Sequence, residues 1–143
     1  MSGAVERFTD RLFSRRNPQG NTNESNPRWL EEPQEHDYQA AQSYLSLIYD
    51  DENASKLVEK LRAAGMSEFA AKDISRASGL ILLPADNEHV RHDQAKVKAG
   101  EQLSPLLLVR APDLGKPIIA DGYHRMCAVY AVDEDTPVRC KIV

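Results

Sequence analysis

The chain has 143 residues, with 18 basic and 22 acidic side chains and therefore a formal net charge of −4. Hydrophobic residues make up 41% and charged residues 28%, which is the composition of a folded globular domain and excludes disordered and collagen-like classes. No apolar run approaches the roughly 18 residues that a membrane-spanning helix needs. The negative net charge also removes any whole-molecule electrostatic argument for DNA binding.

The cysteines and the amino-terminal sequence bear on the cellular compartment. Cys127 and Cys140 are too few for a disulfide framework and lack the Cys-x-x-Cys spacing of zinc and redox sites. Residues 1–16 have no apolar core of a secretory signal peptide. We therefore expect a cytoplasmic protein.

Residues 1–34 are predicted to be a flexible leader and linker. Residues 17–34 are rich in Asn, Gln, Ser and Pro, which favour turns and disorder. Trp29 and Leu30 are the large apolar residues of this stretch, and they either anchor it onto the domain or lie in an interface. Anchoring is the favoured alternative.

Residues 35–143 are predicted to form a single domain, helical over 35–79 and with a sheet over 80–143. Three helices are expected in the first part: one that follows His36, one that ends at a Gly65 cap, and one between Ser67 and Gly79. Apolar residues at helical spacing define their inward faces: Tyr38, Ala41, Leu45 and Ile48; Ala54, Leu57, Val58 and Leu61; and Phe69, Ala70, Ile74 and Ala77.

The second part changes to strand patterns. Residues 80–83 predict a buried strand ended by Pro84, and residues 88–98 a polar helix ended by Gly100. Two strands follow at 105–110 and 117–120, then a helix at 123–132. Residues 137–143 alternate as a last strand, with Cys140 on its inner face.

The segment 117–125 is the part of the sequence that points most directly to chemistry. A strand that runs through a glycine turn into a helix directs unpaired N–H groups and the positive end of the helix dipole toward an anion. His124 and Arg125 add donors in the first helical turn, and a guanidinium can hold two phosphate oxygens. Asp121 is expected to cap the helix, to orient His124 or Arg125, or to hold a metal beside the phosphate; capping is favoured. The pattern predicts a phosphate site at Gly122.

Several of these residues also have structural interpretations. Arg125 can pair with Asp121 or with Glu134. His89, His92 and Asp93 have spacing that allows metal binding, but solvated side chains are favoured because no distant third ligand is recognisable. We therefore assign no metal ligand.

Three motifs carry a family resemblance. Gly122-Tyr123-His124-Arg125 resembles the Gly-Cys-His-Arg motif of sulfiredoxins, and Asp121-Gly122 followed by Arg125 is similar to the Asp-Gly-x-x-Arg pattern of ParB-like domains. Asp93-Gln94-Ala95-Lys96-Val97 resembles the sulfiredoxin helix whose lysine reaches the nucleotide phosphates. Over residues 80–143 the chain thus resembles the ParB/sulfiredoxin-like superfamily, as a stand-alone bacterial member.

The resemblance implies an α+β fold: a small mixed sheet with flanking helices, here preceded by a bundle of about three helices. It also implies that ATP or another nucleotide with Mg²⁺ is the ligand. The residues it places on the phosphates are Lys96, Gly122, Tyr123, His124 and Arg125.

Two departures from the family pattern limit what the resemblance implies. Tyr123 stands where sulfiredoxins have their nucleophilic cysteine, and Cys127, one turn further on, is expected to pack in the core. Standard sulfiredoxin chemistry is therefore not expected. No helix-turn-helix sequence follows the motif, so recognition of partition-site DNA is not expected either.

The leading functional prediction is binding of a nucleotide or other phosphorylated small molecule at residues 122–125. Phosphoryl transfer or NTP hydrolysis is left open, with His124 and Asp121 as the candidate catalytic groups. One alternative is a DNA-associated ParB-like module or nuclease, which the charge does not favour. The other is a non-catalytic interaction domain, with a protein partner or a second copy on the N-terminal helices.

Overall fold

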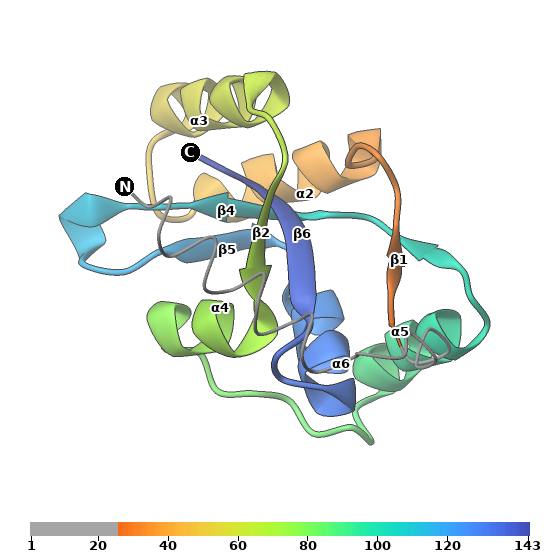
Figure 1. Ribbon diagram of the computed structural model, residues 1–143. Helices are drawn as coiled ribbons and strands as arrows, with labels where there is room; N and C mark the ends of the chain where they lie inside the picture. The colour runs from red at the N-terminus through yellow and green to blue at the C-terminus, as the bar shows by residue number, and fades with distance from the viewer. Residues whose placement is uncertain (1–25) are drawn as a thin grey trace, which may run out of the picture.

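The computed structural model describes residues 26–143 (Figure 1), so the predicted leader over 1–25 lies outside the described residues. The described part is mixed α and β, which confirms the α+β class. Its elements in chain order are β1 (Arg28–Trp29), α2 (Glu35–Leu45), α3 (Asp51–Ala63), β2 (Ser67–Ala70), α4 (Ala71–Ser78), α5 (Glu88–Lys98), β3 (Gln102–Leu103), β4 (Leu106–Val109), the 3₁₀ helix η2 (Pro112–Leu114), β5 (Ile118–Asp121), α6 (Tyr123–Val132) and β6 (Pro137–Ile142).

A four-stranded mixed sheet organises the domain. Its strand order is β2-β6-β4-β5, with β4 parallel to β6 and with antiparallel pairs β2–β6 and β4–β5. Leu108 on β4 lies between Ile119 on β5 and Ile142 on β6. The strands β4, β5 and β6 and the helix α6 confirm the elements that the sequence predicts over residues 105–143.

Helices cover both faces of this sheet (Figure 1). The helices α2 and α3 lie on one face, and α4, α5 and α6 pack on the other. Alternation along β4 divides its apolar side chains between the two layers: Leu107 and Val109 pack with α2 and α3, whereas Leu106 and Leu108 pack with α4 to α6. Each fully buried leucine contributes about 2 kcal/mol through removal of apolar area from water.

The third predicted helix is wrong in its first half. Ser67–Ala70 is the edge strand β2, paired with residues 137–140 of β6, and α4 begins only at Ala71. Ser67 therefore caps no helix, and Ala70 at the helix start makes no side-chain cap.

Gly65 does not close α3 in a left-handed conformation either, because the chain leaves α3 extended at Ala64. The expected three-helix bundle is not formed, since α4 lies across the sheet from α2 and α3.

The predicted strand at 80–83 is also wrong. The segment has no strand pairing, and Ile81 is 85% exposed. Leu82 and Leu83 pack against the core beside α6. An apolar run of this length predicts burial but not a hydrogen-bonding partner strand, and here two of its side chains are partly buried without such a partner.

Residues 28–30 belong to the fold, where the sequence predicts linker. Arg28–Trp29 pairs in parallel with Gln102–Leu103, and the Leu30 amide donates to the Leu103 carbonyl at 2.8 Å. Trp29 is half-buried against the core, as the anchoring alternative predicts. No helix within residues 26–143 has the length and apolar character required to cross a membrane.

Candidate functional site

The turn between β5 and α6 requires a glycine. Gly122 has φ +105°, and a Cβ at this position would lie 2.6 Å from the Leu106 Cγ atom. The helix starts there, since the Met126 amide donates to the Gly122 carbonyl at 2.9 Å. Gly122 has no side chain to cap α6, the first turn of α6 holds no acidic residue, and the Asp121 carboxylate pairs with Arg125, so the predicted capping role of Asp121 is wrong. The amide groups of the first turn thus have no intrahelical acceptors.

Arg125 turns inward to two carboxylates. Its guanidinium lies 3.0 Å from the Asp121 Oδ2 atom and 3.8 Å from the Asp37 Oδ1 atom, and its side chain is 17% exposed. The pairing with Asp121 is the one that the sequence offers as a structural interpretation. This largely buried ion-pair cluster holds β5, α6 and the start of α2 together.

Asp37 is the site residue that the sequence analysis missed. Only 2% exposed, it accepts hydrogen bonds from the Gln34 amide at 2.9 Å and from the Ser104 hydroxyl. An acidic residue at the third position of a helix, reaching back to the preceding backbone, is the signal of a capping box. That signal identifies a helix start but not the long-range contact with Arg125.

The acidic pair shifts the titration of Asp121. Burial raises the pKa of Asp121 to about 6, the Asp37 carboxylate adds to the rise, and Arg125 opposes it. His124 shifts the other way: burial and the neighbouring His89 lower its pKa. The two imidazole rings have centroids 4.7 Å apart. At neutral pH the site therefore holds a carboxyl group close to its titration range and an uncharged imidazole.

Two adjoining cavities make up what we call the polar groove. The first, about 160 Å³, is lined by residues 121–125 and by His89, His92 and Asp93 on α5. The second, about 460 Å³, is lined by Lys96, by Arg28 and His36, and by residues 100–104. Asp93 and Arg125 line both. Gly122, Tyr123 and His124 thus meet in the first cavity, whereas Lys96 lies in the second.

Tyr123 and Cys127 have structural contacts. The Tyr123 hydroxyl donates to the Ile81 carbonyl and so fixes the segment before α5. Cys127 is buried in the core, and burial raises the pKa of its thiol. A protonated, buried thiol is a poor nucleophile, which agrees with the expected core position of Cys127.

The acidic and imidazole side chains of the groove are the groups that could ligate a metal ion. Across residues 26–143, no group of three or more histidine, cysteine, aspartate or glutamate side chains is arranged to hold an ion. The Asp121 carboxylate is already engaged by Arg125. The described residues therefore do not fit a resident Mg²⁺ site.

Comparisons of the chain with protein-family models, with curated proteins and with solved structures each find no match. The resemblance to the ParB/sulfiredoxin-like superfamily therefore rests on the motifs quoted above and stays a prediction.

Proposed function

We propose that the polar groove binds a nucleotide or another phosphorylated small molecule, with a phosphate at the start of α6. The observation that carries this proposal is an uncapped helix start at Gly122 that opens into a groove with cationic and imidazole side chains. Free amides and the helix dipole attract a phosphate. The Gly122 backbone allows close approach because it carries no side chain.

The basic residues divide into two roles. Arg125 is held by Asp121 and Asp37, so it shapes the groove and keeps the two carboxylates in place. Lys96 makes no ion pair within residues 26–143, and His124 faces the cavity with an uncharged ring. Lys96 and His124 are therefore the side chains that we assign to the phosphates.

The groove also holds groups suited to proton transfer. The Asp121 carboxyl group, with a pKa of about 6, and the uncharged imidazole of His124, whose pKa is lowered, are two groups able to accept a proton. Phosphoryl transfer or NTP hydrolysis is the reaction class that these groups favour once a ligand is bound. Mg²⁺ enters this proposal only together with the nucleotide, where it neutralises phosphate charge.

The test is a thermal-shift and calorimetric titration with ATP, CTP, GTP, pyrophosphate and sulfate, each with and without Mg²⁺. A ligand that binds only the folded state stabilises it by about 2.7 kcal/mol at a hundredfold excess over its Kd. We expect Lys96→Gln and His124→Gln to weaken binding at least tenfold. Lys98→Gln, on the same turn of α5 but outside the groove, is the matched control.

Arg125→Ala is unsuitable as the primary test. It leaves Asp37 and Asp121 without their cation, and removal of one partner from a buried pair costs about 3–5 kcal/mol. The proposal fails if no phosphorylated compound shifts the melting temperature of the wild-type chain. Equal binding by Lys96→Gln, His124→Gln and Lys98→Gln contradicts the assignment of the site.

A further inference from the structure

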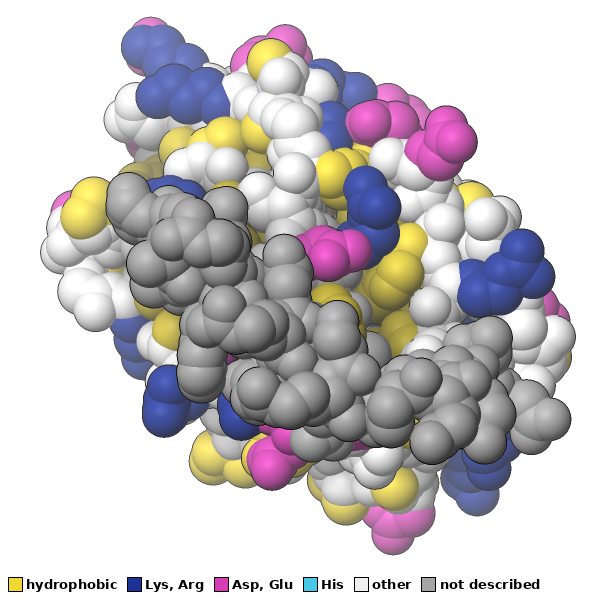
Figure 2. Space-filling view, in the orientation of Figure 1, with side chains coloured by type: hydrophobic (Ala, Val, Ile, Leu, Met, Phe, Trp, Pro, Cys, Tyr) yellow, Lys and Arg dark blue, Asp and Glu magenta, His cyan; other side chains and the backbone are white. Residues whose placement is uncertain are grey.

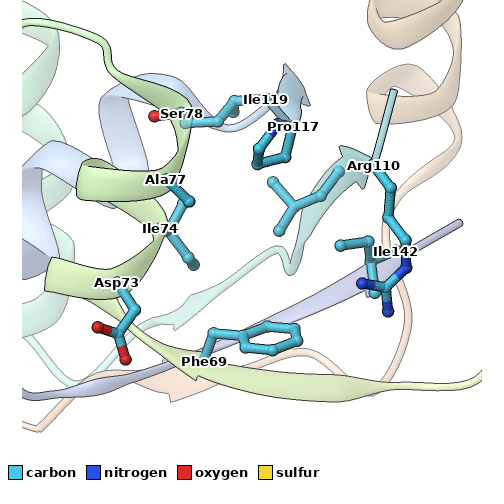
Figure 3. Close-up of a pocket in the computed structure, with 10 residues that line it drawn as sticks. Phe69, Asp73, Ile74, Ala77, Ser78, Arg110, Pro117, Ile119 and Ile142 are labelled. Carbon is cyan, nitrogen blue, oxygen red and sulfur yellow. The ribbon is translucent and has the colours of Figure 1, made fainter. Parts of the chain in front are cut away.

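A third cavity lies beside α4 and shares no lining residue with the polar groove. We call this space of about 320 Å³ the α4 pocket (Figure 3). Its floor is the cross-strand row Ile119, Leu108 and Ile142 on β5, β4 and β6. Ile74 and Ala77 on α4 form one side, and Phe69 on β2 closes one end (Figure 3).

The pocket lies between α4 and the sheet. α4 has eight residues, and Leu108 on β4 and Ile119 on β5 line the space beside it. Pro117, at the start of β5, lies at the far end of this opening. Figure 2 shows apolar side chains at the surface among charged ones on the face that it presents. A pocket of this size with apolar walls and a few polar groups has the character of a small-molecule site.

The charges at the rim are not balanced. Alternation along β4 places Arg110 on the same face as Leu108, and Figure 3 shows its guanidinium beside Ile142, across the pocket from α4. Arg110 is exposed and makes no ion pair within the described residues 26–143. The acidic residue of the rim, Asp73, is paired with Arg76 at 3.3 Å, and its carboxylate points away from the space (Figure 3). One cation is thus left to face an apolar cavity.

We propose that the α4 pocket binds an aliphatic monocarboxylate, with its chain on the Leu108 row and its carboxylate on Arg110. The chain removes apolar wall area from water. The guanidinium can donate two parallel hydrogen bonds to the two oxygens of a carboxylate. An alcohol of the same length gains only the first interaction, and an amine is repelled.

The experiment titrates the full chain with hexanoate, octanoate, 1-octanol and octylamine, followed by amide NMR shifts and calorimetry. We expect saturable octanoate binding that shifts the amides of Arg110 and Ile142. Each added methylene is expected to tighten binding by about three- to fourfold until the pocket is full. Octanoate is expected to bind at least tenfold more tightly than 1-octanol, and octylamine more weakly than either.

Two variants locate the site, each with a matched control. Arg110→Gln is expected to remove the preference for octanoate over 1-octanol, whereas Arg91→Gln on α5 leaves it intact. Ala77→Trp fills the pocket from an exposed helix position and is expected to abolish binding of both octanoate and 1-octanol. Ala40→Trp, on the exposed face of α2, is expected to leave the binding of both unchanged. Lys96→Gln is expected to bind octanoate like the wild type, which separates this result from the phosphate proposal.

Three results overturn the proposal. The first is the absence of saturable octanoate binding by the wild-type chain. The second is binding that survives Ala77→Trp or that shifts amides away from the pocket. The third is closure of the α4 pocket by a second copy of the chain, which would appear as a doubled mass in sedimentation together with no octanoate binding.

Discussion

Arg125 and its two carboxylates carry most of the electrostatic character of the candidate site. One guanidinium cannot neutralise Asp37 and Asp121 together, so the cluster keeps one excess negative charge in a place with little water. Uptake of a proton by Asp121 relieves that excess. Burial is the main reason why the pKa of Asp121 rises to about 6 despite an arginine at 3.0 Å, and the repulsion from Asp37 adds to the rise.

Asp121→Asn is expected to change the pH dependence of stability. The folded-state pKa of Asp121, about 6, lies above its unfolded value of about 3.9, so the folded protein holds this proton more tightly. The contribution of Asp121 to the free energy of unfolding is therefore fully present below about pH 4 and is lost as the pH rises through about 6. Relative to wild type, Asp121→Asn is expected to gain about 2–3 kcal/mol between pH 4 and pH 7, measured by urea unfolding.

His124 is expected to change the stability with pH in the opposite direction. Its pKa is lowered in the folded state, so its contribution to stability falls as the pH drops below about 6.5, the opposite direction from Asp121. Because both proteins contain His124, that contribution cancels in the difference between wild type and variant. If the difference in unfolding free energy between wild type and Asp121→Asn does not change with pH, burial and Asp37 do not raise the pKa of Asp121.

At the residue scale, the sequence predicted those site residues that are neighbours in the chain. Residues 121–125 are adjacent in the chain, so their meeting at one turn could be predicted from the strand–glycine–helix pattern. Asp37 could not be assigned to the site, because its approach to Arg125 depends on how α2 packs on the sheet. The inward direction of Arg125 depends on that same packing.

Helices and strands that are fixed by local sequence pattern could be predicted, whereas a strand that depends on pairing with a distant segment could not. The β4–β5 hairpin, α6 and β6 were predictable because short turns and apolar periodicity fix them locally. Ser67–Ala70 is a strand only because β6, far along the chain, offers it an edge. The residues of α4 that follow are good helix formers, which is why the predicted helix extended over β2.

The β5–α6 connection makes a prediction about glycine. Gly122→Ala combines a positive φ with a Cβ 2.6 Å from Leu106, whereas Gly100→Ala has the positive φ, +76°, with no atom within 4 Å. The backbone conformation alone costs about 1–2 kcal/mol, and forced overpacking adds about 1–3 kcal/mol. Denaturant unfolding is therefore expected to show a loss of about 2–5 kcal/mol for Gly122→Ala and of about 1–2 kcal/mol for Gly100→Ala.

Equal losses in the two variants would contradict the tight contact between Gly122 and Leu106. They would leave only the left-handed backbone as the reason for glycine at this turn. Measurement of both in the same buffer removes the effect that alanine has on the unfolded chain, since that effect is common to them.

For the whole molecule, polar contacts join the layers on the two sides of the sheet. Arg125 connects α6 to α2 through Asp37. Lys141 on β6, buried with 2% of its side chain exposed, connects the sheet to Glu32 at 2.9 Å and to the Arg62 carbonyl at 3.0 Å. The segment before α2 is thereby attached twice, by the β1–β3 pair and by this lysine. The sequence predicted the alternation of β6 but not that its outward lysine is covered.

Glu32→Gln tests whether that attachment stabilises the fold. Burial lowers the pKa of Lys141, but the hydrogen bonds with Glu32 and Tyr38 outweigh it and raise the pKa overall, so the pair contributes at neutral pH and is lost only in strong base. Loss of the carboxylate leaves a buried ammonium group with the Arg62 carbonyl, at an expected cost of about 1–2 kcal/mol because Glu32 itself is exposed. Glu52→Gln breaks the exposed Glu52–Lys56 pair at 3.4 Å and is expected to cost less than about 0.5 kcal/mol. Urea unfolding of both variants at pH 7 measures the contrast, and equal costs would mean that water reaches Lys141 and that Glu32 does not help to hold the segment before α2.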